Sequence, residues 1–463
     1  MAIEHAGEPQ SNEIRRQTLE REPVALRTFT PTQLAIAKSA GVFHWTPEGR
    51  KLYDFTSGVL VTNLGHNPVE WREKFLGYLG WGAAPAQGYF EAAPLTAYNA
   101  ISGVEAEACR RLVENLQAHP GGKRCQQVLW AASGSEAIQK ALWASLAVDS
   151  RRDLILATRD GFHGKKGLAE AVTGSEQDKN RDPRVRFISF PKDECRDLSL
   201  LGAAFDPSKV VAELEGIRGE GRGIACLITE PYLGGGGSYH PPRAYLQALQ
   251  AFCRKHGVIF ILDEIQANFG RTGKMYAFET YGLEPDIVVL GKGLGNGVPA
   301  AAAVGRADIF GALGYGEGSD TFSANPLCCA AVLATLDLFE GQDILGPARR
   351  ASRIIEQEIV ALKKLAFVKH VRGEEGGMVW GIEIADFAGR SANEIANACV
   401  LAAYRGDDQG RAVHLMGPLA KKVLRIAPPL TMTEADARES MACLAACFAQ
   451  VERTATPAGT LAK

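Results

Sequence analysis

Residues 258–266 read Val-Ile-Phe-Ile-Leu-Asp-Glu-Ile-Gln, and this stretch decides the fold. Its first five residues are apolar without polar alternation, which predicts a strand buried on both faces. Similar short runs alternate with helical patterns at 127–131, 154–157, 185–190, 225–229, 287–290 and 300–304. This rhythm predicts an α/β fold with a mostly parallel, seven-stranded sheet that helices cover on both faces.

The length of 463 residues predicts more than one hydrophobic core. In the last quarter, helical faces enclose short strand-like runs at 413–416 and 423–427, which is typical of a smaller α+β domain. We therefore predict three parts. Residues 1–60 form an N-terminal segment that packs on the small domain, 61–326 form the large ligand-binding domain, and 327–463 form the C-terminal small domain.

The composition excludes several classes of partner. Lys and Arg number 51 and Asp and Glu 53, a net charge of −2 without basic clusters, which argues against nucleic acid. No apolar run is long enough for a membrane span, and residues 1–16 lack the apolar core of an export signal, so we expect a cytoplasmic protein. The ten cysteines lack CxxC or Cys/His ligand spacing, so no structural metal is expected. A small molecule is the expected partner.

The carboxyl ends of parallel strands are where ligands bind in such sheets. After residues 127–131 comes a turn of small residues that includes Gly134 and Ser135 and opens a helix. Free N–H groups and the positive end of the helix dipole suit a phosphate there. An ordinary serine cap without a ligand is the alternative for this turn taken alone.

Three further strand ends carry chemically useful side chains. Phe162 and His163 follow residues 154–157, and an aromatic ring beside glycine can lie over a planar ligand or can simply pack. Asp263 follows the central apolar run, where a carboxylate needs a partner, whether a ligand, a helix end or a cation. Lys292 lies between two glycines after residues 287–290, which is the position of a nucleophile rather than of a surface charge.

A phosphate turn, an aromatic plate, a buried acid and a lysine together meet the needs of pyridoxal 5'-phosphate. The stretch from Phe260 to Gln266, then Gly270-Arg-Thr-Gly273, Pro285-Asp-Ile287 and Gly291-Lys-Gly293, resembles the class III aminotransferases of fold type I. That group includes ornithine, acetylornithine and 4-aminobutyrate aminotransferases. The similarity extends from about Thr30 to Gln450 and implies a pyridoxal-phosphate enzyme.

The resemblance implies a role for each matching residue. Lys292 would form the Schiff base with the cofactor, and Asp263 would hold the pyridine nitrogen protonated. The other cofactor contacts that it implies are Gly134 and Ser135 at the phosphate, Phe162 stacked on the ring with His163 beside it, Glu230 after its strand, Gln266 at the phenolic oxygen, and Thr321 at the phosphate of a partner subunit. The last contact implies a homodimer with shared active sites.

Substrate-binding positions partly depart from the better-known members. Arg425 matches the arginine that binds a substrate carboxylate, whereas Lys165 stands where those enzymes place a second arginine. Gly235 replaces a glutamate that shields the first arginine, and Val59 and Gly318 replace a tyrosine and a histidine. These departures argue against ornithine and acetylornithine as donors.

We therefore expect an aminotransferase that moves an amino group from an amine or ω-amino acid to a keto acid, pyruvate or 2-oxoglutarate, by a ping-pong mechanism. A decarboxylation-dependent transaminase or an aminomutase could use the same scaffold. A pyridoxal-phosphate-binding protein without turnover is the non-enzymatic alternative, against which the complete set of Lys292, Asp263, Gln266 and Arg425 argues. Nucleotide binding is disfavoured because residues 293–297 lack G-x-G-x-x-G spacing.

Overall fold

The structure is a computed structural model that describes residues 2–82, 87–178, 181–199 and 204–455. The chain divides into two compact units, each described here by itself. The larger unit comprises Val69–Arg196 and Gly202–Leu345, and the smaller comprises Met1–Pro68, Asp197–Leu201 and Gly346–Lys463.

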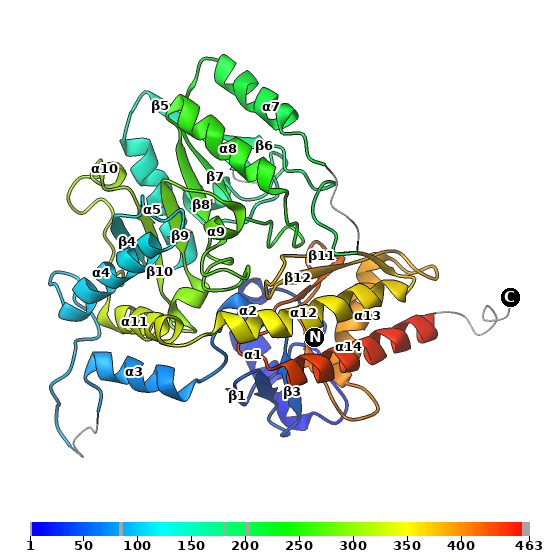
Figure 1. The fold of residues 1–463 in the computed structure, drawn as a ribbon. Helices are drawn as coiled ribbons and strands as arrows, with labels where there is room; N and C mark the ends of the chain where they lie inside the picture. Colours follow the sequence, from blue (N-terminus) through cyan, green and yellow to red (C-terminus); the bar gives the residue numbers. More distant parts are fainter. Residues whose placement is uncertain (1, 83–86, 179–180, 200–203, 456–463) are drawn as a thin grey trace. The chain divides into compact units, whose positions relative to one another are not determined.

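A seven-stranded sheet forms the centre of the larger unit, as the apolar runs predict (Figure 1). Its strands, in spatial order, are β4 (Gln127–Ala131), β10 (Ala301–Gly305), β9 (Ile287–Leu290), β8 (Ile259–Asp263), β7 (Gly223–Thr229), β5 (Arg152–Thr158) and β6 (Val185–Ile188). Only β10 runs antiparallel to its neighbours, β4 and β9, so the sheet is mostly parallel.

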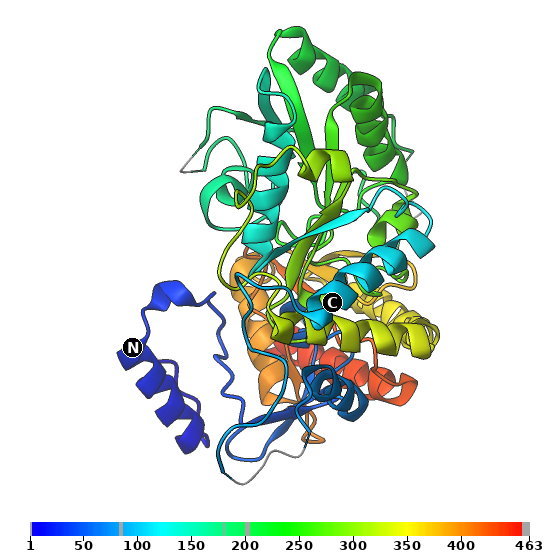
Figure 2. The ribbon, with the colours of Figure 1, turned by 90° about the vertical axis from the view of Figure 1, so that its left-hand side faces the viewer.

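Each central strand contributes to a core on both faces of this sheet. In β8, Phe260 and Leu262 belong to one cluster of buried residues, whereas Ile259 and Ile261 belong to the other. This alternation follows from the two-residue period of a strand and explains why the run is apolar throughout. Figure 2 shows strands of the sheet between helices on either side.

Helices of the larger unit cover the two faces of the sheet. One face packs against α5 (Gly134–Ala147), α6 (Gly167–Ala171) and α10 (Ala307–Phe310). The other face packs against α4 (Gly103–Ala118), α7 (Ser208–Gly219), α8 (Arg243–His256), α9 (Ala277–Tyr281) and α11 (Pro326–Gly341). α3 (Val69–Leu79) packs along α11, where Trp71 Nε1 donates to Thr335 Oγ1 at 2.9 Å.

The described residues of the smaller unit form two sheets. One is antiparallel, with β12 (Trp380–Ile384) between β11 (Val368–Gly373) and β14 (Val423–Ile426). The other sheet combines N-terminal and C-terminal parts of the chain. Its strands, in spatial order, are β1 (Lys38–Ala40), β2 (Phe43–Trp45), β3 (Lys51–Asp54) and β13 (Val413–His414), and β13 pairs in parallel with β3. The helical segments are α1 (Pro9–Arg21), η1 (Val24–Leu26), α2 (Ser57–Leu60), α12 (Leu345–Ala361), η3 (Leu362–Lys364), α13 (Ala392–Arg405) and α14 (Glu434–Ala455).

The two units do not divide where the sequence suggested. Residues 61–68 lie in the smaller unit, and residues 327–345 lie in the larger one rather than in the C-terminal domain. The physical reason for the second difference is that α11, buried along most of its length, packs against α3 and α4 of the larger unit. Asn325 caps this helix by accepting from Cys328 N, as a helix start after Asn-Pro requires. Within the described residues, no helix is long and apolar enough to cross a membrane.

Candidate active site

Asp263 ends β8 and is paired with an imidazole. Its Oδ2 lies 2.7 Å from Nδ1 of His163, and the two side chains are 4% and 0% exposed. Asp263 Oδ1 accepts from Ile265 N at 3.0 Å, so the carboxylate is oriented from two sides. Nε2 of His163 is buried and has no hydrogen-bond partner among the described residues. The pair therefore places an oriented carboxyl group at the carboxyl end of the sheet.

Glu230 follows β7 and holds two loops of the site together. Its Oε1 accepts from Phe162 N at 2.9 Å, and its Oε2 accepts from Gly234 N at 3.2 Å. Burial raises the pKa of Glu230 to about 7, an effect that His163 opposes and Asp263 increases. Glu230 thus fixes the backbone that carries Phe162, a residue that is 43% exposed and able to stack on a planar group.

The glycine run 234–237 packs directly against this site. A Cβ on Gly234 would lie 1.9 Å from Gln266 Oε1, and one on Gly235 would lie 3.0 Å from Phe162 Cβ. A side chain at 234 would displace the Gln266 amide, which occupies that space. Gln266 Oε1 is itself buried with no partner in the described part of the chain. Such an unsatisfied polar end beside an exposed ring fits a planar cofactor with polar substituents.

The turn before α5 has the form expected of an anion site. Ser133 is the N-cap, and its Oγ accepts from Glu136 N at 3.3 Å. The N–H groups of Gly134 and Ser135, the first two helical residues, have no acceptor within the helix. Gly164, beside His163, packs so closely that an added Cβ would lie 2.5 Å from Ser135 Oγ. The predicted phosphate turn and the aromatic segment are therefore adjacent.

Lys292 begins a short 3-10 helix, η2 (Lys292–Gly295), which Gly291 separates from β9. Its φ of +47° is unusual for a residue with a side chain, and such strain is concentrated at functional positions. The preceding carbonyl, of Gly291, accepts from Asn268 Nδ2 at 3.0 Å. Ile265 lies beneath both this segment and the phosphate turn, since Cβ atoms on Gly291 and Gly134 would approach it within 3.4 and 2.9 Å.

The structure does not bring every predicted residue into this group by a described contact. Lys165 and Thr321 are exposed in the larger unit. Arg425 belongs to the smaller unit, where it lies in β14, is 4% exposed, and has Nη2 2.9 Å from Met416 Sδ. The roles of these three residues, like those of the other predicted site residues, stay predictions.

Two residues near the site were missed from the sequence. Asn268 binds the carbonyls of Glu264, Ile265 and Gly291 and so holds the lysine segment against the end of β8. Lys140 is 3% exposed in α5, among the apolar side chains of that helix. A lysine inside a stripe of buried positions was the only available signal for the second residue.

A buried polar cluster in the smaller unit consists of His44, Asp54 and His66. Asp54 Oδ2 lies 2.8 Å from His66 Nε2 and 3.4 Å from His44 Nε2. Two ligands of a tetrahedral zinc ion, each about 2.0–2.1 Å from the metal, would be about 3.3 Å apart. The shorter of the two distances, 2.8 Å, is that of a hydrogen bond. Burial of Asp54 raises its pKa, but the hydrogen bonds from both imidazoles outweigh this effect and hold the pKa below its usual range.

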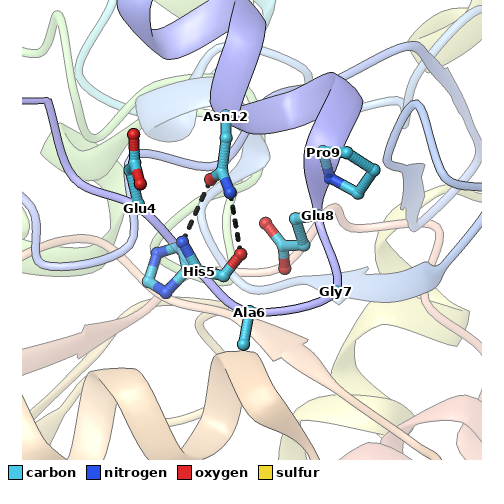
Figure 3. Close-up of a pocket in the computed structure, with 7 residues that line it drawn as sticks. All are labelled: Glu4, His5, Ala6, Gly7, Glu8, Pro9 and Asn12. Carbon is cyan, nitrogen blue, oxygen red and sulfur yellow. Dashed lines mark hydrogen bonds between the residues drawn. The ribbon is translucent and has the colours of Figure 1, made fainter.

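A pocket of about 280 Å³ lies at the N-terminal end of α1 (Figure 3). Its polar groups are largely used internally, because His5 N donates to Asn12 Oδ1 at 3.0 Å and Asn12 Nδ2 donates back to His5 O at 2.8 Å. The lining residues are Glu4, His5, Ala6, Gly7, Glu8, Pro9 and Asn12. None of them is a residue that the sequence predicts for catalysis.

Known proteins resemble this chain over nearly its whole length. Acetylornithine aminotransferase of Bacillus subtilis (strain 168) is 29% identical over 90% of this chain and 96% of that protein. 4-Aminobutyrate aminotransferase GabT of Escherichia coli (strain K12) is 28% identical over 88% and 92%. 5-Aminovalerate aminotransferase DavT of Pseudomonas aeruginosa is 27% identical over 90% and 96%.

Solved structures share the fold. An (S)-enantioselective omega-transaminase from Thermomicrobium roseum superposes with a TM-score of 0.75 at 26% identity, covering 97% of each chain. The ornithine aminotransferase from Toxoplasma gondii ME49 gives a TM-score of 0.78 at 23% identity over 96% of each chain, which is a likeness of fold. The family described as Aminotransferase class-III matches residues 89–448. The chain therefore belongs to the class III aminotransferases and is a pyridoxal-phosphate-dependent transaminase.

Proposed function

We propose that this transaminase takes an amino group from a small amine or an ω-amino acid and passes it to a keto acid, pyruvate or 2-oxoglutarate, in a ping-pong cycle. The observation that carries the proposal is the buried Asp263–His163 pair at the carboxyl end of β8, beside the strained Lys292 segment after β9. A carboxylate beside the ring nitrogen is what protonation of the pyridine would require.

The residues of the group divide the tasks of this proposal among them. The Lys292 amine would hold the cofactor covalently and, when free, would take up and return the proton that the substrate carbon loses. Asp263 keeps the pyridine nitrogen protonated, and His163 keeps Asp263 oriented. When bound, pyridoxal phosphate withdraws electrons from the substrate carbon that loses its proton. Phe162 and Gln266 hold the ring, and the start of α5 holds the phosphate.

We also propose a homodimer in which Thr321 of each chain binds the phosphate in the other. Exposed large apolar side chains on two loops support the proposed dimer, because monomeric proteins seldom expose large groups of apolar side chains to water. Tyr98 joins these loops, with its hydroxyl 3.4 Å from Ser319 Oγ. The exposed residues are Tyr89, Phe90, Leu95, Tyr98, Ile101, Tyr315 and Phe322. The cytoplasmic location stays a prediction from the sequence.

The donor is proposed from chemistry and from the relatives. Arg425 would bind a substrate carboxylate through its planar, bidentate group. Relatives are named for acetylornithine, 4-aminobutyrate and 5-aminovalerate. Lys165 offers only a point charge for a second carboxylate, which favours amines and ω-amino acids with at most one such group.

The decisive experiment uses Lys292→Ala with exposed Lys209→Met as its control. The wild-type protein and the control should be yellow, bleach when single amines are added, and recover their colour with a keto acid. Lys292→Ala should lose the covalent absorbance and turnover. Normal activity in this variant would refute the site. Stoichiometric release of carbon dioxide, or turnover without a keto acid, would instead establish the decarboxylating or aminomutase alternative.

A further inference from the structure

The buried ammonium group of Lys140 lies under the segment that carries Thr321. Lys140 Nζ donates to Trp130 O at 2.6 Å, to Asp320 Oδ2 at 2.7 Å and to Ser323 Oγ at 3.0 Å. An ammonium group has three donors, so these three acceptors satisfy it completely. A cation this buried would be costly without them, and it ties α5 and the end of β4 to residues 320–323.

Asp320 connects Lys140 to the backbone of this segment. Its Oδ1 accepts from Phe322 N at 3.1 Å and from Ser323 N at 2.8 Å, and its Oδ2 also accepts from the Ser323 hydroxyl. Burial raises the pKa of Asp320, but the hydrogen bonds from Lys140 and Ser323 outweigh this effect and hold the pKa below its usual range. The turn is thus built around a charged carboxylate, with the exposed Thr321 at its tip.

The same helix carries the start of the proposed phosphate turn. Gly134 and Ser135 open α5, and Lys140 follows within two turns of the helix. In one chain, α5 therefore contributes N–H groups to that chain's own phosphate, and through Lys140 it fixes the threonine that would reach the phosphate of the other chain.

We propose that Lys140 is a positioning residue that sets Thr321 for the partner subunit's cofactor phosphate, so that cofactor affinity in one site depends on Lys140 of the other chain. This rests on the proposed function, in particular on the contact of Thr321 in trans. Loss of the ammonium group leaves Asp320 without its cation and releases the turn, while the chemistry at Lys292 is untouched.

The first test measures cofactor dissociation from homodimers. Lys140→Met removes the charge at similar length and should weaken cofactor binding about tenfold or more, the effect of losing a hydrogen bond to a charged group. Asp320→Asn keeps an acceptor for the turn, so it should weaken cofactor binding less than Lys140→Met does. Lys209→Met should leave cofactor binding unchanged. Thermal unfolding of the cofactor-free proteins separates local from global damage. Wild-type affinity in folded Lys140→Met would overturn the inference.

Mixed dimers test the trans direction, with Lys292→Ala marking a site that cannot show covalent absorbance. When Lys140→Met and Lys292→Ala lie on different chains, the intact Lys292 site receives Thr321 from a chain with native Lys140, and its affinity should be normal. When both substitutions lie on one chain and the partner is wild type, the intact site should be weakened. The reverse pattern, or equal loss in both dimers, would overturn the inference as a merely structural role.

Two comparisons keep this inference distinct from the proposed function. Thr321→Val should weaken cofactor binding as much as Lys140→Met does. Wild-type affinity in Thr321→Val would refute the contact in trans, and with it the inference. Weakened binding in Thr321→Val with normal binding in Lys140→Met would refute the inference alone. If Lys140→Met does not fold, Ser323→Ala combined with Asp320→Asn removes two members of the anchor and must show the same pattern in mixed dimers.

Discussion

Asp263 and His163 form a buried pair in which Oδ2 of the aspartate lies 2.7 Å from Nδ1 of the imidazole. The histidine keeps one carboxylate oxygen in place, and the backbone N–H of Ile265 keeps the other. An acid held in this way at the end of a central strand can act as the countercharge of a protonated heterocycle.

Replacing Asp263 by Asn should separate binding from chemistry. The amide is of equal size but carries no charge, so the ring nitrogen would lose its proton and proton removal from the substrate should slow by orders of magnitude. Single-turnover rates with a donor amine measure this step, and circular dichroism checks the fold. Exposed Lys209→Met is the control. Wild-type single-turnover rates in Asp263→Asn would refute its role.

Although their roles stay predictions, the strand-end positions of Asp263 and Lys292 could be predicted from the sequence, because Asp263 closes one apolar run and Lys292 follows another after Gly291. Lys140 could not, because its partners Asp320 and Ser323 lie 180 and 183 residues away and only the folded chain brings them together. The direction of β10 was equally hidden, since residues 300–304 are apolar in either orientation.

The boundary between the units was placed too early for a related reason. Asn325-Pro326 correctly marks the start of a helix, but a capping signal does not say which core the helix joins. That depends on the face of α11 that packs against α3 and α4.

Gly234→Ala should disturb Gln266 without straining the backbone. Gly234 is outside the left-handed region, so the obstacle is the Gln266 amide, 1.9 Å from the position of the new methyl group. The amide should turn away, and cofactor affinity should fall about tenfold with a shift of the visible absorbance maximum, in proportion to a lost hydrogen bond. Gln266→Ala should reproduce both effects. Gly235→Ala, whose closest contact is 3.0 Å from Phe162, should have a smaller effect. An unchanged spectrum and affinity in Gly234→Ala would contradict the proposed contact.

Glu230 should make the stability of the cofactor-free protein depend on pH. Burial raises its pKa from 4.5 to about 7, so the folded state holds the proton more tightly than the unfolded state. The resulting stabilisation is complete below the unfolded pKa and is lost as the pH rises through about 7. Urea unfolding should show this loss, with a slope approaching about 1.4 kcal/mol per pH unit for one proton. Glu230→Gln carries no such proton, so its curve should be flatter between these values. Parallel curves for the two proteins would contradict the raised pKa.

Arg425→Ala should distinguish a substrate anchor from a structural arginine. A keto acid that enters a partly dry pocket needs a charged donor with matching geometry, and the guanidinium group supplies two parallel N–H groups to a carboxylate. The keto-acid half-reaction should therefore lose much more than the half-reaction of an amine that has no carboxylate. Gly235 stands where better-known members place a shielding glutamate, so the Arg425 charge should be available in both halves of the cycle.

Since Lys165 offers no bidentate group to a second carboxylate, pyruvate should compete well with 2-oxoglutarate, and Lys165→Arg should shift the preference towards 2-oxoglutarate. Single-turnover rates of the two half-reactions, measured separately over a range of substrate concentrations, test both expectations. Equal losses in the two half-reactions of Arg425→Ala would show that this arginine, buried in β14, serves the small unit's packing and not the substrate.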